Sequence, residues 1–139
     1  MSIAIRPLVD ADVAPVVALW TAAGLTRPWN DPHKDIRRAR EVWPELLLVA
    51  DDDGAVVGTV MAGYDGHRGW LSYLASARRG EGIGRALVAE AERRLLALGC
   101  PKVMLMVRAE NRGVIDYYAE LEYARDDVAV LGKRLIPDV

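Results

Sequence analysis

Apolar residues recur along this chain at two spacings, one typical of strands and one typical of helices. Alternation, or a short continuous apolar run, predicts strands over the ranges 2–7, 46–50, 56–64, 70–75, 102–107 and 128–135. Apolar residues three or four positions apart predict helices over the ranges 10–23, 33–43, 83–98 and 111–121. Helices and strands therefore alternate through most of the chain, and no internal repeat or low-complexity segment interrupts them.

Capping and turn residues indicate how these elements connect. Asp10 is expected to cap the first helix and Gly24 to end it. Residues 51–54, three aspartates and a glycine, predict a hairpin, so the second, third and fourth strands should form an antiparallel meander. The strand over 102–107 is apolar throughout, which is typical of a strand covered on both faces. Because a helix precedes it, this strand should run parallel to the strand over 70–75.

Length and composition are those of an ordinary globular domain. The chain has 139 residues, 52% of them hydrophobic and 27% charged, and a formal net charge of −2. We therefore expect a single domain over 1–139, with neither nucleic acid nor an anionic membrane as a general partner. No signal-peptide pattern and no apolar run approaching ~20 residues occurs, which predicts a cytoplasmic location. The single cysteine, Cys100, is expected to be a buried thiol, and no metal site is expected.

The strongest candidate for chemistry is the glycine-rich stretch 77–87. It joins the strand over 70–75 to an amphipathic helix, where several backbone N–H groups point the same way at the positive end of the helix dipole. Glycines at positions 80, 82 and 84 permit close approach of a ligand or positive φ, and arginines at 78 and 79 add positive charge. The stretch predicts either a phosphate site or a βα turn with convenient glycines.

The order of elements around residues 79–84, with the pattern Arg-x-x-Gly-x-Gly, resembles the Gcn5-related N-acetyltransferase (GNAT) family. The segment 111–123, in which Tyr118 follows Asn111 by seven residues, is also similar to that family. Further stretches resemble its small bacterial YpeA-like subgroup: 27–32, 63–69 and 131–135. The resemblance covers essentially the whole chain. It implies a mixed α/β (α+β) fold, with a mostly antiparallel central sheet flanked by helices and with splayed central parallel strands.

The resemblance implies acetyl-CoA as cosubstrate and transfer of its acetyl group to a primary amine of a small molecule, peptide or protein in a ternary complex. The pyrophosphate would bind the backbone of the glycine turn, and the pantetheine amides would pair with the preceding strand. A backbone N–H near Leu74 or Ala75 would polarise the thioester carbonyl. The residues expected to bind the cofactor are Leu74, Ala75, Ser76, Arg78, Arg79, Gly80, Glu81, Gly82, Ile83, Gly84, Arg85 and Asn111.

The same resemblance implies Tyr118 as the general acid that protonates the departing thiolate, with Tyr117 in reserve; packing alone would also account for Tyr118. Asp65 and His67 are candidates for the general base, and a loop with these residues is also an ordinary turn. Glu110 is a further carboxylate near the splayed strands, and a water chain is another route for the proton. Trp29, Asn30 and Asp31 are expected to form a wall of the acceptor site, or Trp29 is expected to anchor its loop in the core.

Two features depart from the family pattern. The stretch between the strand and the glycine turn is about two residues short, which bears on the bulge in that strand, on the pantetheine register and on cofactor affinity. Glu122 replaces a glycine that commonly precedes the aromatic residue matched by Tyr123, and a positive φ there would strain it. The alternatives to an enzyme are a non-catalytic acetyl-CoA-binding module and a nucleotide binder, although the glycine spacing is not the dinucleotide fingerprint. A homodimer through an exposed strand edge is also compatible with a domain of this size.

Overall fold

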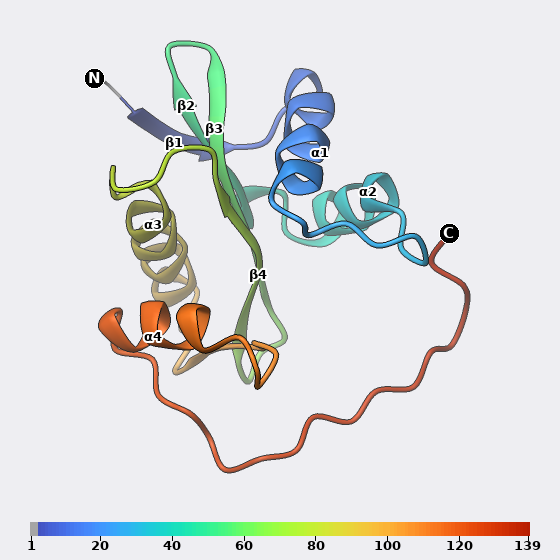
Figure 1. Cartoon of the computed structure of the whole chain (residues 1–139), viewed down its shortest axis with the longest axis vertical. Helices are drawn as coiled ribbons and strands as arrows, with labels where there is room; N and C mark the ends of the chain where they lie inside the picture. Colours follow the sequence, from blue (N-terminus) through green and yellow to red (C-terminus); the bar gives the residue numbers. More distant parts are fainter. Residues whose placement is uncertain (1–2) are drawn as a thin grey trace.

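The computed structural model describes residues 3–139 and contains one mixed sheet with helices on both faces (Figure 1). The strand order is β1-β2-β3-β4-β5. The strands are β1 (Ile3–Pro7), β2 (Leu47–Asp52), β3 (Ala55–Tyr64), β4 (Gly69–Ser76) and β5 (Val103–Leu105). The helices are α1 (Val13–Ala22), α2 (Pro32–Val42), α3 (Ile83–Ala97) and α4 (Arg112–Glu120), with 3-10 turns η1 (Asp10–Asp12) and η2 (Pro44–Leu46). Among residues 3–139, no helix is long and apolar enough to cross a membrane.

The sheet confirms the expected mixed, mostly antiparallel architecture. All neighbouring strands are antiparallel except β4 and β5, which run parallel. β4 pairs with β5 only over Gly69, Trp70 and Leu71, opposite Val103–Leu105, so the two strands separate after Leu71. The expected splayed pair is therefore present. Residue 2 of the expected first strand lies outside the described residues.

Separate apolar clusters fill the two faces of the sheet. α1 and α2 cover one face, where Trp20 and Ile36 pack with Val49 of β2. α3 and α4 cover the other, where Leu48, the neighbour of Val49 in β2, packs with Leu87 of α3. Successive β2 residues point to opposite faces, and both faces are covered. This explains why β2 is apolar at consecutive positions, Leu47 to Ala50, rather than alternating.

The expectation that Asp10 caps the first helix is wrong. Asp10 to Asp12 form a 3-10 turn, and the N-cap of α1 is Asp12, whose side chain makes no capping bond. The buried Asp12 carboxylate instead accepts hydrogen bonds from Arg6 (2.7 Å) and from the Val9 N–H (2.8 Å). Asp10 lies at the surface and pairs with Arg40 (2.7 Å). A buried carboxylate requires charged or N–H partners; Arg6 of β1 supplies the charge and Val9 the N–H.

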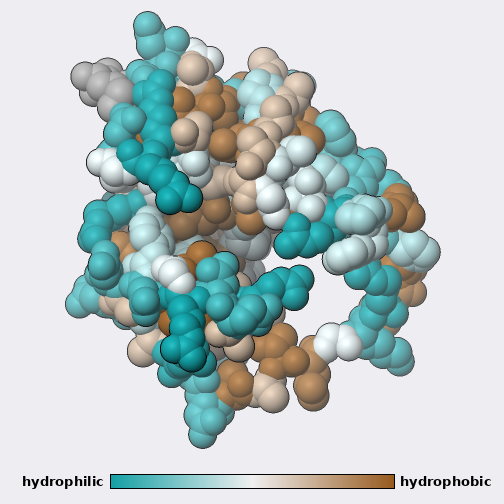
Figure 2. Space-filling model, in the orientation of Figure 1, coloured by the Kyte–Doolittle hydropathy of each residue, from teal (hydrophilic) through white to brown (hydrophobic). Residues whose placement is uncertain are grey.

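The C-terminal tail, residues 121–139, does not form the expected strand over 128–135. It runs from α4 around the molecule to α2 (Figure 1). The Asp31 N–H donates to the Asp138 carbonyl (2.8 Å), and Lys34 Nζ donates to the Val139 oxygen (2.6 Å). Figure 2 shows open space between the tail and the rest of the molecule, and Leu131 is 91% exposed. Held at α2, the tail lies away from β5, which is itself only three residues long instead of the expected run over 102–107.

Two local expectations are confirmed. Cys100 is buried, and its thiol donates to the Lys102 carbonyl (3.3 Å). Glu122 has φ 72°, in the left-handed region where a side chain is strained. Beyond it, the Tyr123 N–H donates to the Tyr118 carbonyl (3.0 Å) and closes the end of α4. Glu122 therefore adopts the left-handed conformation that a glycine would adopt in this turn, and its side chain makes that conformation less favourable.

Candidate functional site

The glycine turn before α3 has the geometry expected of an anion site. Gly80 and Gly82 have φ 76° and 74°, and Gly82 is the N-cap of α3 in the left-handed conformation. A Cβ at either position would meet nothing within 4 Å, so these glycines are required by the backbone conformation and not by crowding. The first N–H groups of α3 have no acceptor within the helix and sit at the positive end of its dipole.

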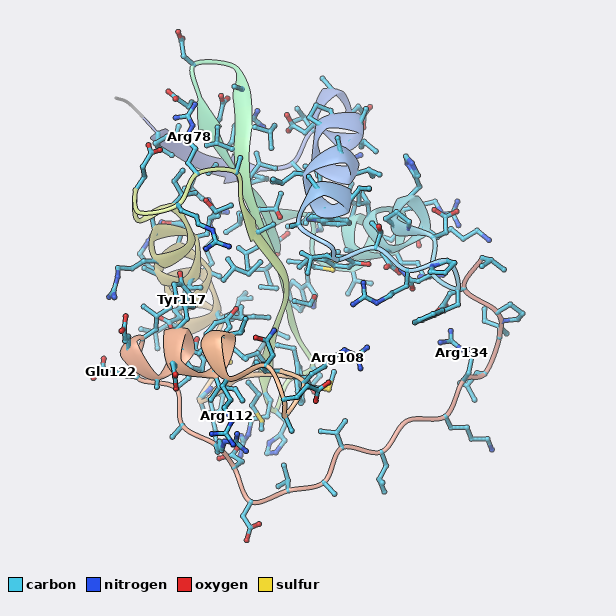
Figure 3. All side chains as sticks on the ribbon, in the orientation of Figure 1. Arg78, Arg108, Arg112, Tyr117, Glu122 and Arg134 are labelled. Carbon is cyan, nitrogen blue, oxygen red and sulfur yellow. The ribbon has the colours of Figure 1, made fainter. Side chains whose placement is uncertain are left out.

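Side chains around the turn divide into buried and exposed. Ile83 is buried against Gly58, where an added Cβ would lie 2.7 Å from Ile83, so only the backbone of Ile83 is available to a ligand. Arg78 lies at the turn (Figure 3) and pairs with Asp52 (2.6 Å). Glu81, Arg79 and Arg85 are exposed. The exposed arginines supply positive charge, and Arg78 also connects the turn to the end of β2.

Glycine is required at position 84 for a different reason than at positions 80 and 82. A Cβ there would lie 2.6 Å from the Tyr117 hydroxyl, so glycine makes room for Tyr117. Figure 3 shows Tyr117 between α3 and α4. Burial raises the pKa of Tyr117, and the charge of Arg85 opposes that shift. Tyr117 therefore links α4 to the first turn of α3.

The strand before the turn carries a bulge despite the short connection. β3 pairs Thr59 with Ala75 and Met61 with Ser72, so two residues of β4, Tyr73 and Leu74, lie opposite one residue of β3. Tyr73 has φ 51°, a strained conformation for a residue with a side chain. The bulge falls immediately after the point where β5 leaves β4. The β4 edge from Ser72 to Ser76, including the predicted cofactor residues Leu74, Ala75 and Ser76, has no β5 partner.

Contacts from three elements hold this bulge. The Trp20 indole N–H donates to the Thr59 hydroxyl (2.8 Å), which donates to the Tyr73 carbonyl (2.9 Å). The Tyr73 ring stacks on Trp20 with centroids 3.8 Å apart. The Tyr73 hydroxyl donates to Asp35 of α2 (2.6 Å), which also accepts from Asn30 (2.7 Å). The strained residue is thus fixed through its backbone, its ring and its hydroxyl.

Tyr118 and Asn111 lie on α4, on the other side of the sheet from α2. Asn111 caps the helix, and its side chain accepts from the Val114 N–H (3.3 Å). Tyr118 is buried, with its ring edge-on to Tyr117 and Tyr123. Burial raises the pKa of Tyr118 to about 12, so its hydroxyl is protonated at neutral pH. This protonation state is the one that a general acid requires.

Asp65 and His67 lie in the turn between β3 and β4. Asp65 accepts from the N–H groups of Arg68 (2.7 Å) and His67 (2.8 Å) and from the Trp70 indole (3.2 Å). These donors, the Arg68 N–H foremost, lower the pKa of the Asp65 carboxyl and so weaken it as a base. Both side chains are exposed and stand outside the groove described next. The indole of Trp70, which lines the groove, connects Asp65 to it.

A groove of about 460 Å³ lies between α2 and the outer part of the sheet. Residues of α2, β3 and β4 and the neighbouring Trp43 line it: Asp35, Arg38, Ala39, Val42, Trp43, Met61, Ala62, Gly63, Trp70, Ser72 and Tyr73. Figure 2 shows the molecule hollowed where β4 passes between α2 and α4. Trp29 is 54% exposed, so it does not anchor its loop in the core, and it does not line this groove. The groove reaches the bulge from the face opposite α3 and α4.

The sequence reading missed Asp35, Tyr73 and Thr59, which support the bulge. Asp35 and Tyr73 are 38 positions apart, and neither stands in a recognisable motif. The one available signal was Thr59, a polar residue inside the otherwise apolar run of β3 that is 0% exposed. A buried hydroxyl requires partners, so this position pointed to a specific polar contact.

Known proteins resemble this chain in sequence and in fold. Residues 16–123 match the acetyltransferase (GNAT) family. Ard1 from Thermoplasma volcanium has a TM-score of 0.78 at 23% identity, over 89% of this chain and 84% of that one. PaiA N-acetyltransferase from Thermoplasma acidophilum, in complex with coenzyme A, has a TM-score of 0.76 at 20% identity, over 93% and 94%. The chain belongs to the GNAT acetyltransferase family, and the expected fold is confirmed.

Bacterial proteins named acetyltransferase are similar to this chain over nearly its full length. Acetyltransferase YE1169 from Yersinia enterocolitica is 48% identical over 136 residues, 96% of each chain. Acetyltransferase SG1711 from Sodalis glossinidius is 50% identical over 137 residues, again 96% of each. The expected bacterial acetyltransferase group is therefore confirmed.

Proposed function

We propose that this protein is an N-acetyltransferase that moves the acetyl group of acetyl-CoA to a primary amine by direct attack in a ternary complex. The observation that carries the proposal is the separation of β4 from β5 after Leu71, beside the glycine turn that begins α3. An unpaired strand edge needs hydrogen-bond partners, and a pantetheine chain offers amides that supply them. Bacterial relatives named acetyltransferase and a structural neighbour solved with coenzyme A support the same reading.

The residues present fit the cofactor. The left-handed glycines at 80 and 82 leave the backbone of the turn open, and the exposed Arg79 and Arg85 offset phosphate charge. The β4 edge at Leu74, Ala75 and Ser76 accepts the pantetheine. The cofactor, when bound, supplies a reactive acetyl thioester.

The chain provides two groups for the chemistry. A backbone N–H beside the bulge, at Leu74 or Ala75, stabilises negative charge that develops on the thioester carbonyl oxygen. Tyr118 donates its phenolic proton to the departing thiolate, since its raised pKa keeps it protonated. The amine enters from the groove on the opposite face, so acetyl donor and acceptor meet at the bulge.

Asp65 and His67 are proposed as the route by which the amine loses its proton. They lie one residue away from the groove, because the Trp70 indole that lines it donates to Asp65. Water in the groove is the competing route. Replacing His67 with Gln separates the two: a loss of the acidic limb from the pH profile of kcat/KM supports His67, and an unchanged profile supports water.

Thermal unfolding with acetyl-CoA, with NADH and ATP as controls, tests the cofactor site. A ligand at 100 times its Kd stabilises the native state by ~2.7 kcal/mol, so acetyl-CoA alone should raise the midpoint clearly. Release of the CoA thiol with a mixture of amines then tests turnover. Stabilisation without thiol release would favour the non-catalytic acetyl-CoA-binding module, and no stabilisation would remove the proposal.

A further inference from the structure

The groove between α2 and β4 carries an inference about the acceptor, which rests on the proposed function. We propose that it selects a primary amine whose body is one flat apolar group, about the size of a phenyl or indole ring, over polyamines and amino sugars. The lining residues, the charge they carry and the direction in which the groove runs each support this assignment.

The lining is mostly apolar and contains two tryptophans. Trp43 and Trp70 stand in it with the aliphatic or thioether residues Ala39, Val42, Met61 and Ala62. Trp70 is 39% exposed and Val42 is 67% exposed, so large apolar surfaces face the groove without a covering element. Exposed apolar side chains around a concave surface are typical of a ligand site, and about 460 Å³ accommodates one or two rings.

The charge of the lining is balanced. Asp35 and Arg38 are its charged members, and they pair with each other (2.9 Å). A polyamine or an aminoglycoside carries several positive charges and needs several carboxylates, which this lining does not offer. Asp35 already accepts from Arg38, Tyr73 and Asn30, so the acceptor position left on the carboxylate holds no more than one ammonium. Arg38 further disfavours additional positive charge through like-charge repulsion.

The groove also has a direction. Asp35 meets the Tyr73 hydroxyl (2.6 Å), so the carboxylate lies at the outer end of the side chain whose backbone forms the bulge. Trp70 lies three residues earlier on β4, and Trp43 donates to the Tyr64 carbonyl near the same end of the sheet (3.0 Å). An amine with its nitrogen near Asp35 therefore lays its apolar body towards Trp70 and Trp43.

Steady-state release of the CoA thiol at saturating acetyl-CoA tests the selection with phenethylamine, propylamine, spermidine and glucosamine. Phenethylamine should have a kcat/KM at least about tenfold above spermidine and glucosamine. Trp70→Ala should lower kcat/KM for phenethylamine about tenfold and for propylamine less than about twofold, because the phenyl ring loses its contact while Asp65 keeps the His67 and Arg68 N–H donors. Trp29→Ala, an exposed tryptophan outside the lining, is the matched control and should change neither.

A second variant tests the charge argument. Arg38→Ala should raise kcat/KM for spermidine about fivefold relative to phenethylamine, since it removes the repelling guanidinium. If spermidine is the better substrate of the natural protein, or if Trp70→Ala affects all amines equally, the inference is wrong although the protein remains an acetyltransferase.

Calorimetric titration of phenethylamine into the natural protein and into Trp70→Ala gives a readout that does not depend on turnover. Weaker binding of phenethylamine to Trp70→Ala than to the natural protein supports the groove assignment. If no amine releases thiol, that result counts against the proposed enzyme but not against the groove assignment. Absence of binding to the natural protein, with acetyl-CoA present and absent, would overturn the assignment of the groove.

Discussion

The two sides of β4 differ in how they are built. The proposed cofactor side is built chiefly on one continuous segment, the β4 edge and the turn over 72–84, which offers backbone groups to a ligand. The proposed acceptor side is assembled from α2, β3, β4 and Trp43, which are distant in the sequence, and it offers mainly side chains to a ligand. Ser72 and Tyr73 of β4 belong to both.

This difference separates a general function from a specific one. A backbone site built from glycines and a helix start tolerates change in most side chains and binds the same cofactor. A side-chain groove changes its ligand whenever one lining residue changes. We therefore expect variants on the cofactor side to affect catalysis with every amine, and variants on the acceptor side to affect one class of amine more than another.

Tyr118→Phe should give the largest effect and act on the cofactor side alone. Removing a general acid lowers kcat by roughly 10²-fold or more, while KM for the amine should change little because Tyr118 lies on the face opposite the groove. Burial raises the pKa of Tyr118 to about 12, so its hydroxyl stays protonated at lower pH. The basic limb of the pH profile below about pH 10 should consequently keep its position in the variant.

Tyr117→Phe is the control for Tyr118, because it removes a hydroxyl one residue away that packs on Gly84. If Tyr117→Phe causes the larger loss of kcat, the general acid is Tyr117 and the assignment of Tyr118 is wrong. The measurement is kcat and KM from thiol release between about pH 6 and 10 with one good amine.

Thr59→Val should follow, because it weakens the element common to both sides. The change leaves the Trp20 indole N–H and the Tyr73 carbonyl without their buried partner, at about 1–3 kcal/mol for each unsatisfied group. Chemical denaturation should therefore show that the free energy of unfolding falls by several kcal/mol at most. The value of kcat should fall for all amines.

Thr59→Ser keeps the hydroxyl and serves as the matched control. It should retain most of the stability and of kcat, losing only the packing of one methyl group. Equal losses in Thr59→Ser and Thr59→Val would show that packing at this position matters and that the hydrogen-bonded chain does not.

The contrast between the two sides also explains what could be predicted from the sequence. The hairpin over 51–54, the helix after the glycine turn and the parallel β4–β5 pair depend on local patterns, and all were expected. The strand over 128–135 was wrong because strand formation requires a neighbouring edge, and the tail is instead held at α2 by Asp31 and Lys34. Local apolar spacing does not reveal such a partner.

The candidate site divides in the same way. The left-handed glycines at 80 and 82 and the cap at Asn111 could be predicted because each reflects its own local backbone. The contact between Asp35 and Tyr73 could not, since tertiary folding alone brings α2 against β4. The contact that requires a glycine at position 84 is with Tyr117 of α4, and the sequence around Gly84 does not reveal that distant partner.

Gly82→Ala should have a smaller effect, confined to the cofactor side. Alanine in the left-handed conformation costs about 1–2 kcal/mol. If the turn relaxes to avoid this cost, its backbone N–H groups move, and acetyl-CoA should bind more weakly. Gly66→Ala is the matched control, because Gly66 has φ 90° and equally open surroundings but lies in the β3–β4 turn. Thermal unfolding should show similar losses for both variants without ligand, and only Gly82→Ala should show a reduced shift with acetyl-CoA. Equal shifts in the two would mean that the glycine turn is not the phosphate site.

Removal of the last two residues, Asp138 and Val139, should have the smallest effect and act on the acceptor side. The deletion removes the acceptor of the Asp31 N–H, a carboxylate 3.8 Å from Arg38 and the partner of Lys34. These contacts are largely exposed, so the free energy of unfolding should fall by less than about 1 kcal/mol.

Because Arg38 lines the groove and pairs with Asp35, loosening its surroundings should raise KM for the amine about twofold to threefold and leave kcat and the acetyl-CoA shift unchanged. A Lys34→Ala variant removes one tail contact without touching Arg38 and should leave KM unchanged. If the truncation instead lowers kcat or weakens the binding of acetyl-CoA, the tail affects the cofactor side. The two sides of β4 would then not be independent of each other.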